Sequence, residues 1–251
     1  MILVIGGISE AKALCERLSE KYETTLSVAT EYGAELVKGG SYRVVYGKKS
    51  AEDFQQILGS ERFSLVIDCS HPFAENVSRE IETACKAVNI PILRYKRKST
   101  EYQGEHIVRV TGFPEAIQKA KELRGDKMVF LATGSNHLAD FAAQIPADKL
   151  VARVLNRQAS LAICKENGIP DCQVIAKCGP FSKAENLIDF SKYPVGVVVS
   201  KDSGTAGGTA EKIEAAEELN LATVLICPPV YQGVCYDSLD AVYEQAQAIL
   251  K

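Results

Sequence analysis

Several short segments rich in glycine, hydroxyl and charged residues follow apolar runs of this 251-residue sequence. The first, Gly6-Gly7-Ile8-Ser9-Glu10-Ala11, comes directly after the apolar run Ile2 to Ile5. Glycines let a backbone approach a ligand closely, and free N–H groups at the start of the next helix attract phosphate. The segment favours a nucleotide-binding turn in which Ser9 caps the helix and reaches a phosphate. The alternative is that Gly6 and Gly7 only make the turn.

The end of the second predicted strand, Ser27-Val28-Ala29-Thr30, bears on the kind of nucleotide. Folds that select NAD usually place an acidic residue there to bind the ribose hydroxyls, and this strand reaches none before Glu31. A short hydroxyl side chain leaves room for a 2′-phosphate, so we expect NADP or NADPH. Thr30 is expected near that phosphate, with Lys12 or Arg43 as its counter-charge.

The segment Ser70-His71-Pro72-Phe73-Ala74 directly follows a predicted buried strand. Loops at the carboxyl ends of parallel strands meet ligands in open α/β sheets. The functional interpretation therefore places His71 beside a nicotinamide or a substrate, as a positioning group. The alternative is a histidine that only satisfies backbone groups in a turn.

Two loops of the second half repeat this arrangement. Thr133-Gly134-Ser135-Asn136-His137 is either an anion site or a plain turn in which Ser135 or Asn136 caps the next helix. Ser200-Lys201-Asp202-Ser203-Gly204, followed by Gly207-Gly208, places charged and hydroxyl groups on a glycine-rich segment after another apolar run. Loops carry function more often than packing, so we favour a functional loop over a mobile surface connection.

A basic run extends from Arg94 to Lys98, and Arg153 and Arg157 lie further along. Such a run is usually a solvated face. Arginine also pairs with carboxylates through two parallel hydrogen bonds, so these residues would suit a ligand that carries several carboxylates.

Alternating apolar runs and helical stretches must position these loops, and they predict parallel sheets flanked by helices. The expected strands are 2–5, 24–29, 42–46, 64–68, 91–95, 127–132, 149–154, 172–176, 195–200 and 222–227. The expected helices are 9–22, 31–39, 50–59, 74–88, 113–124, 135–143, 156–167, 183–191, 208–219 and 237–250.

The polar stretch in the middle of the chain predicts two α/β lobes. We expect a first lobe over 1–95, a crossover over 96–110 and a second lobe over 111–251, with the active site in the cleft between the lobes. Ser50 with Asp53 is expected to cap one helix, and Gly125 and Gly168 are expected to end two others.

Composition narrows the class of protein. The chain is 46% apolar and 24% charged with a net charge of −3, and it lacks a basic aromatic stripe that would suit nucleic acid. No apolar run approaches the ~20 residues that span a bilayer, and the N-terminus enters a strand directly, so we expect a cytoplasmic protein. Eight cysteines without a Cys-x-x-Cys pair, beside three histidines, predict structural thiols and no metal site.

The motifs, taken in order, resemble the precorrin-6A reductase family of cobalamin biosynthesis. The matching segments of this sequence run from the first strand to residue 216 and cover nearly the whole chain. They are Gly6-Gly7-x-x-Glu10-Ala11, Ala29-Thr30-x-x-Gly33, Asp68-x-Ser70-His71-Pro72-Phe73-Ala74, Arg94-x-x-Arg97, Gly134-Ser135, Gly179-Pro180-Phe181-Ser182, Lys201-Asp202-Ser203-Gly204 and Gly207-Gly208-x-x-Glu211-Lys212-x-x-Ala215-Ala216. The sequence departs from the family at Ile8, where a threonine is usual.

The resemblance implies two Rossmann-like lobes and an oxidoreductase that uses NADPH to reduce the C18–C19 double bond of precorrin-6A, or of its cobalt complex, to precorrin-6B. We expect Gly6, Gly7, Ile8, Ser9, Glu10, Thr30, Ser70, His71 and Pro72 to bind the cofactor. We expect Arg94, Arg97, Lys201, Ser203 and Gly204 to bind the tetrapyrrole, and His71, Lys201 and Asp202 to be catalytic. The alternatives are an NADP-dependent reductase of another polyanionic small molecule and a non-catalytic NADP-binding sensor.

Overall fold

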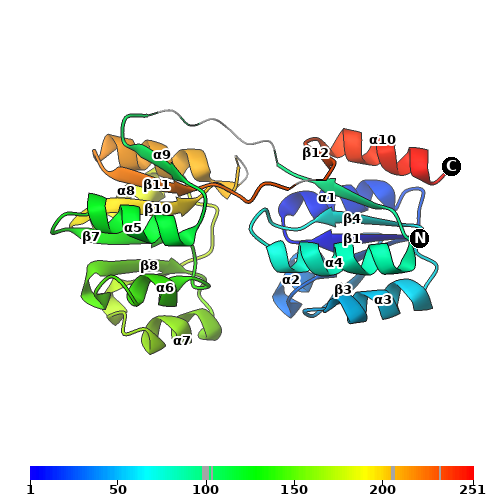
Figure 1. Cartoon of the computed structure of the whole chain (residues 1–251), viewed down its shortest axis with the longest axis horizontal. Coiled ribbons are helices and arrows are strands. Elements are labelled where there is room, and N and C mark those ends of the chain that lie inside the picture. The colour runs from blue at the N-terminus through cyan, green and yellow to red at the C-terminus, as the bar shows by residue number, and fades with distance from the viewer. Residues whose placement is uncertain (98–101, 103, 205–206, 232) are drawn as a thin grey trace. The chain divides into compact units, whose positions relative to one another are not determined.

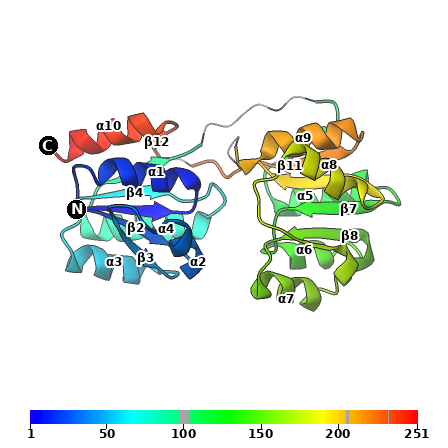
Figure 2. The same cartoon turned by 180° about the vertical axis from the view of Figure 1, so that it is seen from behind.

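The computed structural model describes residues 1–97, 102, 104–204, 207–231 and 233–251. The chain forms two units, one of Met1–Lys98 with Val230–Lys251 and one of Ser99–Pro229. In the described residues each unit holds a six-stranded, fully parallel sheet with helices on both faces (Figures 1 and 2). The predicted α/β class with two parallel sheets is therefore confirmed. No described helix is both long and apolar enough to span a membrane.

The sheet of the first unit has the order β12-β5-β4-β1-β2-β3. Its strands are β1 (Ile2–Gly6), β2 (Thr24–Val28), β3 (Arg43–Tyr46), β4 (Leu65–Cys69), β5 (Ile92–Tyr95) and β12 (Cys235–Tyr236). Its helices are α1 (Ser9–Leu18), α2 (Glu31–Leu36), α3 (Ala51–Ser60), α4 (Glu75–Val88) and α10 (Leu239–Ile249). Counted from the β3 edge, this is the strand order of dinucleotide-binding folds.

Side chains that alternate along the central strands build a core on each face of this sheet. Ile2 and Val4 of β1 pack with α1, α2 and α10 on one face. Leu3 and Ile5 of the same strand pack with α3 and α4 on the other. Because both faces are covered, β1, β2 and β4 consist of apolar and small residues except for Asp68, and their positions could therefore be predicted from the sequence.

The sheet of the second unit has the order β6-β11-β10-β7-β8-β9. Its strands are β6 (Ile107–Val110), β7 (Met128–Ala132), β8 (Leu150–Val154), β9 (Val174–Ala176), β10 (Val195–Lys201) and β11 (Ala222–Ile226). Its helices are α5 (Phe113–Leu123), α6 (Leu138–Ala142), α7 (Gln158–Glu166), α8 (Lys183–Ser191) and α9 (Thr209–Glu218), with short 3₁₀ turns at Ala147–Lys149 and Asp171–Gln173. A core centred on Phe130 and Phe190 lies beneath α8 and α9.

The domain boundaries differ from those expected from the sequence. The strand β6 lies inside the expected crossover 96–110 and joins the second sheet beside β11. The last segment of the expected second lobe, Val230–Lys251, belongs to the first unit, where β12 pairs with β5 and α10 buries Val242 and Ala246. Local periodicity predicts that 237–250 is a helix, but it does not indicate which sheet that helix covers.

Several helix ends follow the sequence and two do not. Ser50 and Asp53 form the expected capping box on α3, and Gly125 and Gly168 follow the C-cap residues of α5 and α7. The expected Ser9 cap is wrong, because Ile8 occupies the N-cap of α1 and Ser9 is already helical. The expected cap from Ser135 or Asn136 is also wrong, because α6 begins only after His137.

The cysteines lie mostly in the cores. Cys15, Cys69, Cys85 and Cys164 are buried as free thiols. Burial raises the pKa of Cys15 and of Cys85 to about 12. These groups therefore stay protonated near neutral pH and behave as small apolar side chains.

Candidate active site

The loops after β1 and β4 mark the switch point of the first sheet. The chain runs from β1 to β2 and β3 on one side of the sheet and returns to β4 and β5 on the other. Ligands of open α/β sheets bind where the strand order reverses in this way. The register pairs Gly6 with Cys69, so the two loops leave the sheet next to each other.

Gly6 and Gly7 allow two different close approaches. A Cβ atom on Gly6 would lie 2.8 Å from Leu26 Cδ1, so this glycine lets β1 pack tightly against β2. A Cβ atom on Gly7 would lie 2.9 Å from the backbone nitrogen of His71 and 3.2 Å from Ser70 Cα. The glycine pair therefore makes the turn and also admits the loop that follows β4, which brings two predicted motifs into contact.

The start of α1 combines uncapped N–H groups with a neutralised carboxylate. No described side chain caps α1, and Ile8 packs against the core instead. Ser9 Oγ donates to Glu10 Oε2 at 2.9 Å, and Arg97 donates to both carboxylate oxygens of Glu10, at 2.5 and 2.7 Å. Burial opposes ionisation of Glu10, but the hydrogen bonds from Arg97, from its own backbone and from Ser9 outweigh it and lower the pKa of Glu10.

A second ion pair lies at the end of β4. Asp68 accepts from the Ser70 N–H at 2.9 Å and from Arg94 on the neighbouring strand at 3.0 Å, and its side chain is only 2% exposed. The Arg94 guanidinium also lies over the ring of Tyr231, 4.6 Å from its centroid. Arg94 and Arg97, both expected to bind substrate, are therefore paired with carboxylates of their own unit. Lys98, the end of the basic run, lies outside the described residues.

The segment after β4 is held in place by hydrogen bonds to α4 and within its own turn. Ser70 is buried, and its hydroxyl forms a hydrogen bond of 3.0 Å with Ser78 of α4. The Phe73 N–H donates to His71 Nδ1 at 3.2 Å, so a neutral His71 ring carries its proton on Nε2. His71 and Pro72 are half-buried. The turn thus fixes the orientation of the His71 ring, as a positioning role requires.

Thr30 lies where β2 ends. It is the exposed N-cap of α2, and its Oγ1 accepts from the Gly33 N–H at 3.1 Å. The hydroxyl proton of Thr30 is not used by this cap and can be donated to a ligand. Of the two expected counter-charges, Arg43 lies at the opposite edge of the sheet, where it contacts Thr25 and Glu61.

The residues at this edge fit a dinucleotide. The uncapped first turn of α1 offers N–H groups and the positive end of a helix dipole. The charge of Glu10, which would repel a diphosphate, is balanced by Arg97. The backbone of Gly7 can be approached without steric hindrance from a side chain.

The second unit has an equivalent switch point between β7 and β10. Ala132 pairs with Ser200, so the loops that begin at Thr133 and Asp202 leave the sheet side by side. In the part of the chain that the structure describes, the hydroxyl of Thr133 is buried and has no hydrogen-bond partner. A buried hydroxyl without a partner is costly, and a polar ligand at this edge would satisfy it.

The segment 201–204 folds around a buried carboxylate. Asp202 is 2% exposed and accepts from the Gly204 N–H at 3.3 Å and from Arg109 at 3.4 Å. The Ser203 N–H donates to Thr209 Oγ1 at 3.1 Å. The adjoining Thr205 and Ala206 lie outside the described residues. Because its carboxylate organises the loop, Asp202 presents Ser203 and Gly204 at the sheet edge.

Lys201 lies beside an aromatic pair that the sequence did not single out. Its Nζ is 5.6 Å from the ring centroid of Phe113, and that ring stacks on His137 at 3.5 Å. Burial lowers the pKa of Lys201. The sequence predicted Phe113 only as the first residue of a helix. Its place at this edge of the sheet was missed because the strand before it, β6, was not predicted.

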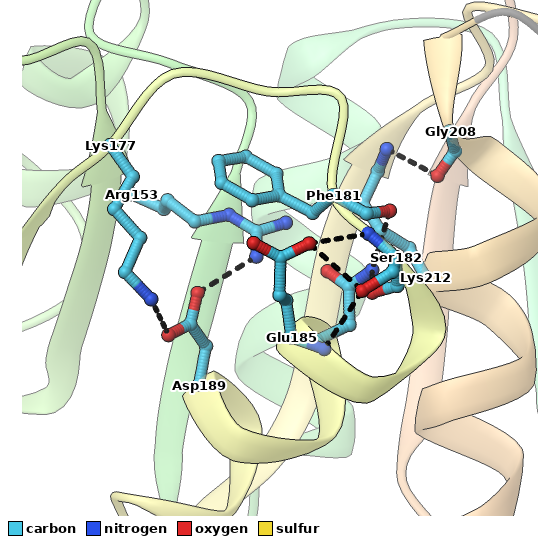
Figure 3. Close-up of polar contacts among 9 residues, drawn as sticks. Arg153, Lys177, Phe181, Ser182, Glu185, Asp189, Gly208 and Lys212 are labelled. Carbon is cyan, nitrogen blue, oxygen red and sulfur yellow. Dashed lines mark hydrogen bonds and ion pairs between the residues drawn. The ribbon is translucent and has the colours of Figure 1, made fainter.

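Figure 3 shows a polar network next to the loop that follows β9. Asp189 accepts from Arg153 at 3.1 Å and from Lys177 at 2.6 Å. The Arg153 guanidinium lies 4.0 Å from the ring centroid of Phe181. Arg153 is only 4% exposed, so it supports the loop from inside the unit and its partner carboxylate belongs to the protein.

The Gly207-Gly208 turn is held by Lys212. The Lys212 ammonium donates to Gly207 O at 3.0 Å and to Gly208 O at 2.6 Å (Figure 3 shows the second bond). Burial and the nearby charge of Arg153 lower the pKa of Lys212 to about 8. The family-like motif at 207–212 therefore includes a buried cation that binds backbone carbonyls.

The chain has two doubly wound α/β units, and the first has the strand order and the glycine turn of dinucleotide-binding folds. The fold and the site therefore place it in the class of doubly wound α/β proteins with a dinucleotide-binding fold. Residues 1–249 match the model of the family described as precorrin-6x reductase CbiJ/CobK. The chain belongs to this family, whose members are oxidoreductases.

Similar curated proteins agree with this assignment, and a solved structure agrees with the fold. The cobalt-precorrin-6A reductase of Priestia megaterium is 32% identical over 247 residues, which are 96% of each chain. That of Salmonella typhimurium is 33% identical over 231 residues, 91% of this chain and 87% of the relative. A solved structure of CobK precorrin-6A reductase superposes with a TM-score of 0.81 at 24% identity and covers 99% of this chain and 96% of that one. At that identity it supports the fold.

Proposed function

We propose that this protein uses NADPH to reduce the C18–C19 double bond of precorrin-6A or of its cobalt complex. Membership of the precorrin-6x reductase family supports the reaction. The observation that carries the cofactor assignment is the meeting of the loops after β1 and β4 at Gly7, beside an uncapped helix start. The absence of an acidic residue between Val28 and Thr30 favours the phosphorylated cofactor.

In this proposal the first unit binds and orients the cofactor. N–H groups after Gly6, Gly7 and Ile8 bind the diphosphate, with Ser9 beside them, while Thr30 donates to the ribose phosphate. Ser70, His71 and Pro72 border the nicotinamide, and Glu10 acts through its pair with Arg97, which fixes the start of α1. When bound, NADPH supplies a hydride to the macrocycle.

The second unit supplies substrate contacts and candidates for the proton that must reach the other ring carbon. Lys201, Ser203 and Gly204 are proposed to bind carboxylates of the tetrapyrrole. Among the proposed catalytic groups, Lys201 is suited to proton transfer because burial lowers its pKa. Asp202 acts by holding the loop in place, through the Gly204 N–H.

The experiment is to incubate the protein with NADPH and either metal-free or cobalt-loaded precorrin-6A, and to follow NADPH and macrocycle absorbance together. One NADPH should be consumed for each macrocycle reduced, and none in its absence. Lys201→Met should slow the reaction strongly, whereas Lys192→Met, at an exposed position after α8, should not. Binding of NADPH without oxidation in the presence of either macrocycle would support a sensor and contradict the proposal.

A further inference from the structure

Of the two residues that the sequence suggested as the counter-charge of a 2′-phosphate, Arg43 lies at the wrong edge of the sheet and Lys12 stays untested. Arg43 begins β3, and its guanidinium contacts Thr25 and Glu61 at the amino edge of the sheet. Lys12 lies on α1, where its Nζ is 4.0 Å from a carboxylate oxygen of Glu16. The ribose phosphate would lie at the carboxyl edge near Thr30, so a cation in the loops of that edge is a further candidate.

The ends of β2 and β3 place such a cation at the same edge of the sheet as Thr30. The two strands are parallel neighbours, with Val28 opposite Tyr46, and the Gly47 N–H donates to Val28 O at 3.0 Å. The chain leaves both strands at this edge, toward Thr30 after β2 and toward Lys48 after β3. The ribose of a bound dinucleotide lies at the end of the second strand of such folds.

The turn after β3 presents one lysine and retains the other. Gly47 has a φ of +116°, a conformation that glycine adopts without strain. Lys49 Nζ donates back to Gly47 O at 3.0 Å, and burial lowers the pKa of Lys49. Lys48 is exposed, and no carboxylate of the described residues forms an ion pair with it.

Both lysines border an open cavity of about 540 Å³ between the end of β3 and α3. Its other lining residues are Tyr46, Asp53, Gln56, Ile57 and Ser60. The carboxylate of Asp53 accepts from the Ser50 N–H in the capping box of α3, so it already has a partner. The rim of the cavity at Lys48 and Lys49 can therefore receive a phosphate group.

We propose that Lys48 binds the 2′-phosphate of the cofactor and that Lys49 stabilises the turn that presents it. This inference rests on the proposed use of NADPH. It assigns the selectivity for NADPH over NADH to a residue after β3, with Thr30 as the hydroxyl partner. Glu31, exposed at the start of α2, is the competing group, because a carboxylate there would instead bind the ribose hydroxyls of NADH.

The test measures dissociation constants for NADPH and NADH by fluorescence titration of the full-length wild type, Lys48→Ala and Lys38→Ala. Lys38 is the matched control, an exposed lysine beyond the far end of α2 that pairs with Glu35. Lys48→Ala should weaken NADPH binding about tenfold, the size of one charge-assisted hydrogen bond, and leave NADH binding unchanged. Adenosine 2′,5′-bisphosphate should lose the same factor and adenosine 5′-monophosphate none.

Each outcome decides between the inference and the proposed function. Wild-type preference for NADPH that survives in Lys48→Ala overturns the role of Lys48 and leaves the proposed function standing. Equal weakening of NADPH and NADH shows that Lys48 supports the fold and also overturns it. A wild type that binds NADH more tightly contradicts both proposals and assigns the ribose to Glu31.

Discussion

The ion pair between Glu10 and Arg97 leads to our most specific prediction. Arg97 donates to Glu10 from Nε and from Nη2, at 2.5 and 2.7 Å. The Glu10 side chain is 17% exposed and that of Arg97 is 10% exposed. Arg97→Ala leaves a mostly buried carboxylate without its partner. Breaking a fully buried pair costs about 3–5 kcal/mol, and residual solvent screening reduces this to about 2–3 kcal/mol. At about 2–4 °C for each kcal/mol, the melting temperature should fall by about 4–12 °C.

Thermal melting of the wild type, Arg97→Ala, Glu10→Gln and the double variant isolates the pair. We expect a coupling energy of about 2 kcal/mol, because the second substitution removes a group that has already lost its partner. Lys86→Ala, which breaks the exposed pair with Glu82, is the control and should leave the melting temperature unchanged.

The pH dependence has a definite sign. The pKa of Glu10 is lowered in the folded protein, so the stabilisation is complete above its ordinary value of 4.5 and is lost as pH falls through the folded value. The gap between wild type and Arg97→Ala should therefore close on acidification. An unchanged melting temperature with a raised KM for the tetrapyrrole would refute this reasoning and show that Arg97 binds substrate.

Three further substitutions test the two switch points. Gly7→Ala should lower the free energy of unfolding by about 1–3 kcal/mol and weaken NADPH binding, because its Cβ would lie 2.9 Å from the backbone nitrogen of His71. The control is Gly59→Ala on α3, where a Cβ meets no atom within 4 Å, and it should change neither the melting temperature nor the NADPH titration. Thr133→Val removes a buried hydroxyl without a described partner, so the melting temperature should hold or rise while KM for the tetrapyrrole rises; an unchanged KM would exclude a ligand there. The pKa of Lys212 is about 8 in the folded protein and 10.5 ordinarily, so the unfolded chain binds the extra proton between these values. The stability of the wild type relative to Lys212→Met should therefore rise as pH increases from about 8 to 10, and parallel pH profiles of the two proteins would contradict this.

Most of the architecture could be predicted because the strands are buried on both faces. Runs such as Leu65–Cys69 are too short for surface helices, and all of their residues are buried. The missed strands are the exceptions to this pattern. β6 follows a long polar stretch, and β12 has two residues, which give no periodicity.

The candidate site could be predicted as a set of loops, and its internal pairing could not. The types of Arg94 and Arg97 suggested ligands for carboxylates, but their partners Asp68 and Glu10 lie 26 and 87 residues away. An arginine that binds a distant protein carboxylate and one that binds a substrate have the same local sequence. Only the parallel register of β4 and β5 shows which carboxylate Arg94 contacts.

The two units also share a structural feature, a buried aspartate that holds the loop at the switch point. Each switch point has a buried aspartate at the carboxyl end of a central strand: Asp68 near the end of β4 and Asp202 directly after β10. Each accepts from the N–H two residues ahead and from an arginine of another strand. The two sheets also have the same strand order, and in each the edge strand beside the last pair comes from a distant segment of the chain. The strand β12 of the first sheet follows the residues of the second unit, and β6 of the second sheet follows Met1–Lys98 of the first. Because both carboxylates already accept hydrogen bonds from their own unit, we infer that their charge orders the loops, and that the half-buried side chains of His71, Lys201 and Ser203 are the groups available to cofactor and substrate.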